Sequence, residues 1–347
     1  GVFNLSNSAD TPTSSQFESG YRIFGVLANA SLGYKNAAFL ELSARNDWSS
    51  TLPTDSNSFF YGAIGTSVIA TDLFNIKNDI LNYAKLRASV GTTGKDADLY
   101  ALESVFIGNP ELIDLGDFSQ NLPKDGVPGF TLGNTIGNPD LKPEITTTVE
   151  LGTDLGFFNN MINLSYTYYK STHSDQLVTI SLPNSSGYTQ TTSNVGELTN
   201  TGHEATFSIS PLKNVVKDLK FELFASYSTN KNEVVKVSDD TDELFIGGPF
   251  EDITLIAKEG LAFGTFKGLT NLTNDAGQTI VNSDGFPILT AEDEVLGSFQ
   301  PDYLMSFGSS GNYKGFGFSI LFDLKKGGSF VSRTKAATEF NGTALHT

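Results

Sequence analysis

The sequence predicts an all-β fold, specifically part of an antiparallel transmembrane β-barrel. Between Ala37 and Trp48, apolar side chains such as Leu40 and Leu42 alternate with charged ones such as Glu41 and Arg45. Because successive side chains of a strand point to opposite faces, this segment separates an apolar medium from an aqueous one. Similar segments follow along the chain, and the links between them are alternately short and long. This alternation is expected of strands that run up and down through a membrane.

The same pattern predicts about ten strands along the chain. Their expected ranges are 21–34, 37–48, 59–70, 81–93, 144–157, 160–172, 193–210, 218–230, 301–311 and 314–325. Soluble strands most often have about 5 to 6 residues, whereas a tilted strand needs about 9 to 11 to cross the hydrocarbon layer. Most of the predicted strands are therefore long enough to cross a membrane.

The connections between these strands divide into two sets. Short ones are expected near 35–36, 158–160, 211–217 and 312–313, and the link 71–80 is a turn of medium length where a short one is expected. Barrels of the outer membrane have short periplasmic turns and longer extracellular loops. We therefore expect long extracellular loops near 94–143, 173–192 and 231–300.

Each strand has one apolar and one polar face. The apolar series include Phe24, Val26, Ala28, Ala30 and Leu32 at one end of the chain and Phe316, Phe318, Ile320, Phe322 and Leu324 at the other. An Arg or Lys at the bilayer midplane costs roughly 2 to 4 kcal/mol, so the charged side chains are expected to face the lumen. The facing of 59–70 is ambiguous. Aromatic residues near the strand ends, including Tyr34, Trp48, Tyr168, Tyr169 and Tyr303, suggest two interfacial girdles.

Composition narrows the function classes. The chain has 347 residues, a formal net charge of −17 and no cysteine. Phosphate binding relies on basic surface, so nucleic acid is not an expected partner, and neither disulfides nor thiolate metal sites can form. The acidic run Asp239, Asp240, Asp242, Glu243, Glu251 and Asp252 is expected to be a solvated face, with a site for a cation or basic partner as the alternative. The chain starts at Gly1 without a signal peptide, which suggests a processed or truncated piece.

One short motif is particularly informative. Residues 137–144 are Gly137, Asn138, Pro139, Asp140, Leu141, Lys142, Pro143 and Glu144, and a predicted strand follows them directly. This segment resembles the carboxy-terminal half of SusC/RagA-type TonB-dependent transporters, the outer-membrane nutrient importers of the Bacteroidetes. Further stretches that resemble the family occur in the same order, at 1–8, 86–94, 186–188, 194–204, 260–268 and 313–316. Together they span nearly the whole chain.

The resemblance implies a barrel of 22 strands in the bacterial outer membrane, filled by an amino-terminal plug. It also implies a SusD-like surface lipoprotein as a lid, and import of an oligosaccharide or peptide driven by TonB. No region of this chain resembles the plug or the TonB box. Ten strands leave two open edges that lipid penalises, so we expect the partner strands to come from sequence outside this chain. The tail 334–347 is predicted to be a polar loop.

Two sets of residues are candidates for roles in the loops. Tyr100 and Tyr188 have rings that could stack on a substrate such as a sugar, although exposed aromatic residues also pack on neighbouring loops. The two prolines of the 137–144 motif, Pro139 and Pro143, lack backbone donors and have fixed φ angles. We therefore expect this motif to be a rigid structural lead-in to its strand rather than a ligand site.

Metal-binding and enzymatic functions find little support. A calcium loop with Gly285 at its sixth position would have Ile280 at its first position and Ala291 at its twelfth, and neither fits. A plain Asp-Gly turn is therefore expected at Asp284–Gly285. His173, His203 and His346 are isolated from one another, and carboxylates that share a strand face are equally expected of a polar lumen. The sequence predicts no enzyme, no metal and no cofactor.

Two other classes of protein remain as alternatives. A soluble β-sandwich carbohydrate-binding module would explain the alternating strands and the acidity, but not the strand lengths or the alternation of short and long links. A passive porin would share every periodicity and would lack only the plug and lid. The ordered motifs favour the transporter.

Overall fold

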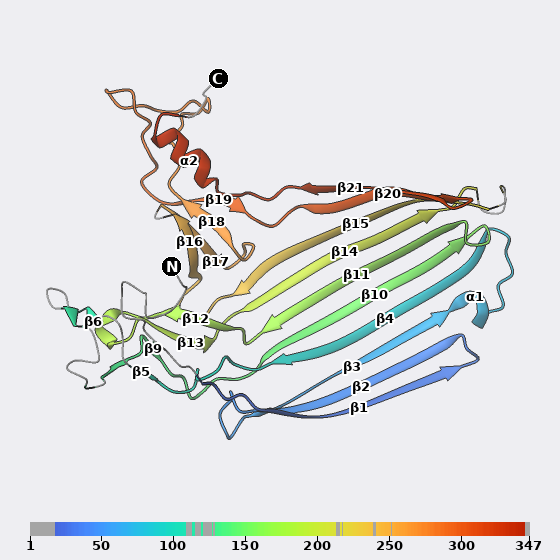
Figure 1. Ribbon diagram of the computed structural model, residues 1–347, viewed down its shortest axis with the longest axis horizontal. Coiled ribbons are helices and arrows are strands. Elements are labelled where there is room, and N and C mark those ends of the chain that lie inside the picture. Colours follow the sequence, from blue (N-terminus) through green and yellow to red (C-terminus); the bar gives the residue numbers. More distant parts are fainter. Residues whose placement is uncertain are drawn as a thin grey trace, which may run out of the picture.

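The chain folds around one broad antiparallel sheet of ten strands, in the order β1-β2-β3-β4-β10-β11-β14-β15-β20-β21. The computed structural model describes residues 18–108, 113–114, 119–120, 127, 129–212, 216, 218–238, 241–250 and 252–343. The ten long strands are β1 (Ile23–Tyr34), β2 (Ala38–Ser49), β3 (Ser58–Ile69), β4 (Leu81–Lys95), β10 (Glu144–Phe157), β11 (Ile162–Ser174), β14 (Glu197–Ile209), β15 (Leu219–Lys236), β20 (Tyr303–Tyr313) and β21 (Phe316–Lys326). They lie side by side as a curved wall (Figure 1).

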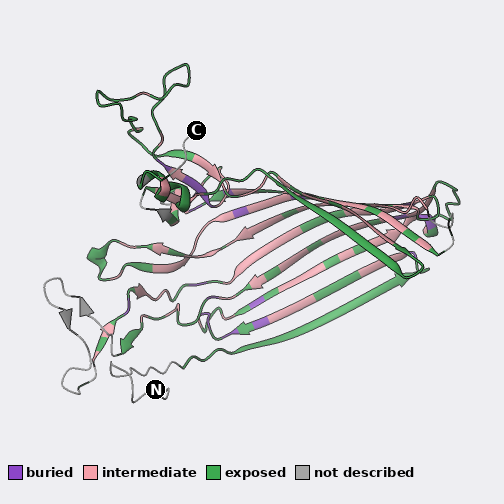
Figure 2. Ribbon diagram, turned by 45° about the horizontal axis from the view of Figure 1, so that its top comes forward, coloured by how far each residue is buried: buried purple, intermediate pink, exposed green. Residues whose placement is uncertain are grey.

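All ten predicted strands are present, and each pairs with the next along the chain. The largest differences in their bounds are at β14, which begins at Glu197 rather than 193, and at β15, which extends to Lys236 rather than 230. The ten strands form one continuous sheet rather than two packed sheets, so the β-sandwich alternative is wrong. The outermost strands β1 and β21 are exposed along their whole lengths (Figure 2), as expected of the two open edges of a partial barrel.

Strand register shows that the sheet has one apolar and one polar face. Residues directly opposite in an antiparallel pair lie on the same face. Leu42, Ile64, Val90 and Val149 form one row across four neighbouring strands, and Glu41, Gly65, Ser89 and Glu150 form the adjacent row on the other face. We call these the apolar face and the polar face. The register also settles β3, whose facing the sequence left ambiguous, because Ile64 lies between Leu42 and Val90.

One predicted member of the aromatic girdles is on the wrong face. Tyr168 lies opposite Leu151 on the apolar face, whereas Tyr169 lies opposite Glu150 on the polar face. Consecutive residues of a strand must point in opposite directions, so both tyrosines could not have belonged to one outer ring. Tyr169 therefore lines the polar face.

The two ends of the sheet differ. The short turns lie at one end together with α1 (Ala70–Leu73), and the long connections lie at the other (Figure 1). Within the described residues the long connections contain β5 (Phe106–Gly108), β6 (Ile113–Asp114), β7 (Ser119–Gln120), β8 (Phe130–Leu132), β9 (Thr135–Ile136), β12 (Leu177–Ser181), η2 (Asn184–Ser186), β13 (Gln190–Asn194), β16 (Glu243–Phe250), β17 (Ile253–Lys258), β18 (Thr265–Gly268) and β19 (Glu294–Ser298). They pair into small sheets, β12-β13-β9 and β16-β17-β18-β19 among them.

The two clusters of buried apolar residues lie near the long-connection end. One cluster contains Leu52, Phe59, Ala97 and Leu141, and a second contains Leu198, Val234, Val237 and Ala257. The middle of the wall has no comparable core, because a single sheet leaves both of its faces open (Figure 2). The packed part of this chain therefore supports the long connections rather than the strands.

The predicted polar loop at 334–347 is wrong for its first half. Residues Arg333–Phe340 form helix α2, and residues 344–347 lie outside the described part of the chain. The Ser332 side chain accepts a hydrogen bond from Lys335 N at 3.2 Å, and Lys335 lies 3.7 Å from Glu339. Such a cap and an i,i+4 ion pair both favour a helix. No helix in the described part of the chain is long and apolar enough to span a membrane.

Candidate functional site

The polar face is built from ionic and hydroxyl side chains held by cross-strand contacts. Arg87 on β4 pairs with Asp154 on β10, with Nε 3.1 Å from Oδ2 and Nη2 3.2 Å from Oδ1. Ser165 on β11 donates to the same Asp154 Oδ1 at 2.6 Å. Nη2 donates the hydrogen bond of this pair, whereas Nε is close to Oδ2 but has no hydrogen-bond partner among the described residues. The side chains of Arg87 and Asp154 are still 37% and 31% exposed, so the pair lies on a surface open to water.

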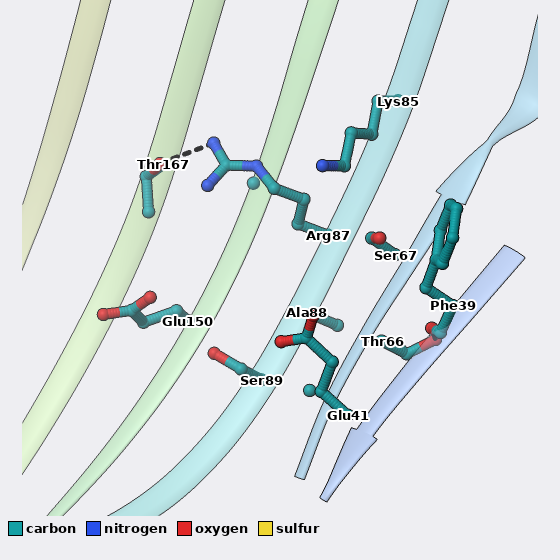
Figure 3. Close-up of a pocket in the computed structure, with 12 residues that line it drawn as sticks. Phe39, Glu41, Thr66, Ser67, Lys85, Arg87, Ala88, Ser89, Glu150 and Thr167 are labelled. Atoms are coloured by element: carbon teal, nitrogen blue, oxygen red, sulfur yellow. Dashed lines mark hydrogen bonds between the residues drawn. The ribbon is translucent and has the colours of Figure 1, made fainter. Parts of the chain in front are cut away.

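A hollow of about 210 Å³ lies beside this ion pair. Its lining includes Glu41, Lys85, Arg87, Ser89 and Glu150, which come from β2, β4 and β10 (Figure 3). Gly65 and Ser89 lie between Glu41 and Glu150 in their row. Because these two residues are small, they leave open space above the sheet between the two carboxylates. The hollow is hydrophilic and carries charges of both signs, which suits contact with water or with polar groups of a passing solute.

The 137–144 motif joins two of the long connections. Asn138 donates to the Thr192 carbonyl at 2.9 Å, and Lys142 N donates to Asn194 Oδ1 at 2.7 Å. Asn194 in turn donates to the Lys142 carbonyl at 2.7 Å. Leu141 is completely buried in the cluster with Phe59. The motif thereby ties the connection before β10 to the connection between β11 and β14.

The first and last residues of the 137–144 motif are also held in place by neighbouring parts of the chain. A Cβ at Gly137 would overlap the backbone of Glu103, so only glycine fits there. At the other end, Glu144 accepts from Leu177 N at 2.8 Å and lies 3.4 Å from the Lys95 ammonium. These contacts involve only neighbouring protein groups.

The two predicted substrate contacts lie on different connections. Tyr100 follows β4, is half exposed, and its hydroxyl accepts from Gly20 N at 3.1 Å. Its φ of 61° is in the left-handed region, which non-glycine residues seldom adopt. Tyr188 lies between η2 and β13, where its backbone N donates to Ser186 Oγ at 3.3 Å. No contact between the two rings is seen within the described residues.

A buried hydroxyl cluster that the sequence did not reveal holds the start of β1 against the end of β4. Asp96 accepts hydrogen bonds from Ser49, from Thr51 at 2.9 Å and from Tyr21 at 3.0 Å. Burial acts to raise the pKa of Asp96, but these three hydrogen bonds outweigh it and hold the pKa below its ordinary value. No periodic pattern links residues 21, 49, 51 and 96, so this cluster could be found only in three dimensions.

The acidic run in the last long connection is partly neutralised. Asp239, Asp240 and Glu251 lie outside the described residues. Glu243 on β16 pairs with Lys258 on the neighbouring strand β17 at 3.2 Å and with Lys267 on the following strand β18 at 2.6 Å. The hydrogen bond from Lys267 lowers the pKa of Glu243. The prediction of a solvated face is therefore wrong for Glu243, which is an internal link of this sheet.

Metal-binding geometry is not seen in the described part of the chain, where no group of three or more His, Asp or Glu side chains could hold an ion. In the Asp284–Gly285 turn, Asn282 Oδ1 accepts from the backbone N of Asp284 and of Phe286, both at 3.0 Å. His203 lies on the apolar face, where Tyr166 OH lies 2.7 Å from its Nδ1. His173 is bonded to Thr146 and Asn200 on the polar face, and His346 lies outside the described residues.

A wall of ten long strands with one continuous apolar face and one charged face defines a class of protein, the transmembrane β-barrel. The comparison with known families is specific, since residues 2–343 match the family described as TonB dependent receptor-like, beta-barrel. The chain belongs to this family of outer-membrane proteins. The apolar face is therefore the lipid-facing side of the barrel, and the polar face lines its lumen.

Relatives in two bacteria agree with this assignment. The chain is 28% identical over 356 residues to TonB-dependent receptor P3 of Formosa agariphila, an alignment that covers 95% of this chain and 34% of that protein. It is 28% identical over 261 residues to TonB-dependent receptor SusC of Bacteroides thetaiotaomicron, covering 70% of this chain and 25% of SusC. The chain therefore spans about a third or less of the length of these curated relatives.

The fold also matches a solved structure. The RagAB peptide transporter superposes with a TM-score of 0.74 at 21% identity, covering 93% of this chain and 36% of that one. At this identity the match shows the fold alone. It confirms the prediction of a partial barrel, and the family match together with the relationship to SusC confirms the predicted family.

Proposed function

We propose that the protein containing this chain imports an oligosaccharide or peptide nutrient across the outer membrane, with this chain supplying barrel wall and extracellular loops. One observation carries the proposal: the long connections all leave the same end of the sheet, and two of them are joined to each other. Strand β9 of one connection pairs with β13 of the next, and the 137–144 motif bonds to Thr192 and Asn194. Functional residues are often carried by loops held on a rigid scaffold.

In this proposal the joined loops 94–143 and 173–192, together with 231–300, form the outer vestibule for the substrate. Tyr100 and Tyr188 are its candidate aromatic contacts, and the polar hollow near Arg87 belongs to the aqueous path below it. A SusD-like lipoprotein would cover the vestibule, and TonB would act through a plug domain of the longer protein. The name of the RagAB peptide transporter supports peptide as one of the two substrate classes. The role of the chain is transport rather than catalysis.

The experiment is uptake of labelled oligosaccharides and labelled peptides by cells that produce the full-length protein. Replacing 99–135 by a short Gly-Ser linker should abolish uptake of the nutrient and weaken capture of the lid lipoprotein. Replacing the exposed periplasmic-side turn 74–79 by a linker of equal length is the matched control and should leave both unchanged. Uptake that survives the 99–135 replacement would contradict the vestibule assignment.

Energy coupling distinguishes import by a TonB-dependent transporter from passage through a passive porin. A protonophore removes the proton gradient that drives TonB, so it should stop uptake by the transporter. Uptake that continues unchanged after the protonophore would favour the porin. The tyrosine contacts are tested separately: Tyr100→Ala and Tyr188→Ala should each raise the substrate concentration for half-maximal uptake severalfold without changing the amount of protein in the membrane.

A further inference from the structure

The lipid-facing side of this acidic chain carries lysines at its extracellular end. We propose that Lys170, Lys231 and Lys326 bind the phosphate groups of the phosphorylated glycolipid that forms the outer leaflet of the outer membrane. The inference depends on the membrane location of the barrel and not on which nutrient it imports. We call these three residues the basic band.

The register places all three lysines on the apolar face. Lys170 lies opposite Val149 on β10 and opposite Thr201 on β14, and Thr201 lies opposite Lys231 on β15. Lys170 and Lys231 are therefore two strands apart in one row, about 10 Å at the usual spacing. Lys326 is opposite Tyr303 at the edge of the sheet. In the same row, β2, β3 and β4 carry Leu42, Ile64 and Val90.

The charges on this face are unevenly placed. Among the ten long strands, the register puts cations on the apolar face at these three lysines and at Lys236, which lies opposite Glu197, and it puts acidic residues there at Glu197 and Glu233, all toward the long-connection end. The polar face, by contrast, carries both signs, as in the Arg87–Asp154 pair. A chain with a net charge of −17 thus presents a lysine-bearing rim just where its wall leaves the hydrocarbon.

Aromatic side chains fix the depth of the basic band. Tyr168 lies one same-face step below Lys170, about 7 Å at the usual rise, and its ring contacts the His203 ring with centroids 5.3 Å apart. Tyr303, opposite Lys326, packs on Tyr227 with centroids 5.5 Å apart. Amphipathic rings are favoured at headgroup level, so Lys326, level with Tyr303, and Lys170, one step above Tyr168, reach the level of the lipid phosphates.

The lysines are available for such a ligand. Lys170 and Lys326 are exposed, and neither has an ion-pair partner among the described residues. The Lys231 side chain is 79% exposed and pairs with Glu233 at 3.0 Å. Glu233 therefore competes with a phosphate for Lys231. Replacing Glu233 should strengthen lipid binding, whereas replacing a lysine should weaken it.

The test is native mass spectrometry of the full-length protein in a neutral detergent with added diphosphoryl lipid A, and with dephosphorylated lipid A as the comparison ligand. The wild type should retain the phosphorylated form preferentially. Each of Lys170→Gln, Lys231→Gln and Lys326→Gln should weaken that binding roughly fivefold, the usual effect of one lysine at an anionic lipid surface. Glu233→Gln should strengthen it. Lys325→Gln, on the neighbouring residue that faces the lumen opposite Leu304, is the matched control and should change nothing.

Three results would overturn the proposal. They are equal retention of both forms of lipid A, an equal loss of binding in Lys325→Gln and Lys326→Gln, and displacement of the lipid by millimolar inorganic phosphate, which would indicate a site for free phosphate. Heat-modifiable mobility in electrophoresis confirms that each variant contains a folded barrel before its lipid binding is compared.

Discussion

Leu141 allows a quantitative test of how the loops are held. Its side chain is fully buried against Leu52, Phe59 and Ala97 in the cluster below the joined connections. Leu141→Ala removes three buried carbons, which costs about 2.4 kcal/mol at about 0.8 kcal/mol for each methylene. A cavity that does not collapse raises the total to about 3 kcal/mol. Opening of this loop segment should therefore become more than 100-fold more frequent, since about 1.4 kcal/mol corresponds to a factor of ten.

Hydrogen exchange of the full-length protein measures this opening directly. The informative amides are Asn138 N, bonded to the Ala101 carbonyl at 2.9 Å, and Lys142 N, bonded to Asn194 Oδ1 at 2.7 Å. Their protection should fall about 100-fold, provided that they exchange by this local opening. Amides in the middle of β10 and β11 should keep their protection, because the wall strands have their own ladder of hydrogen bonds.

Leu99→Ala is the matched control for Leu141→Ala. Leu99 belongs to the same connection but is 39% exposed, so its truncation should change protection by only a few fold. The reasoning would be refuted by a Leu141→Ala variant whose Asn138 and Lys142 amides exchange within threefold of the wild type. It would also be refuted if the two variants behaved alike, because burial at Leu141 would then not determine how the loops are held.

Three other substitutions test different contacts. The hydrogen bonds to Asp96 hold its pKa below the unfolded value, so the stability that the Asp96 carboxylate contributes is full above about pH 4 and is lost as pH falls through the folded pKa. Asp96→Asn should therefore destabilise the start of β1 at pH 7, which proteolysis near Tyr21 measures. The difference between the variant and the wild type should vanish in acid. Gly202→Ala should impair barrel assembly, measured as heat-modifiable mobility, because the added Cβ would lie 2.5 Å from the Tyr169 ring. Gly317→Ala is the control and should assemble normally, because the atom nearest to its added Cβ is 3.6 Å away. Glu243→Gln should weaken the pairs with Lys258 and Lys267 and raise proteolysis of 241–268 severalfold at low salt, and an unchanged rate would show that these pairs do not hold the small sheet.

The candidate site could be predicted from the sequence only in part. The 137–144 motif was recognisable because its prolines and its likeness to a family are local properties. Its contacts with Thr192 and Asn194, some fifty residues further on, are not local, and no periodicity indicates which loop a loop will touch. The Asp96 cluster and the pairing of β9 with β13 were missed for the same reason. Whether Tyr100 and Tyr188 contact a substrate stays a prediction.

The sequence by itself determined the ten wall strands, the face of nearly every residue in them and the alternation of short and long connections. It could do so because a membrane imposes a strict alternation of apolar and polar side chains on each strand, and that alternation is written in consecutive residues. Tertiary structure alone decided the facing of β3, which depended on its neighbours Leu42 and Val90, and the placement of Tyr169 in the lumen. It also decided the folding of the loops into small sheets, because loop contacts join residues far apart in the chain and follow no repeat.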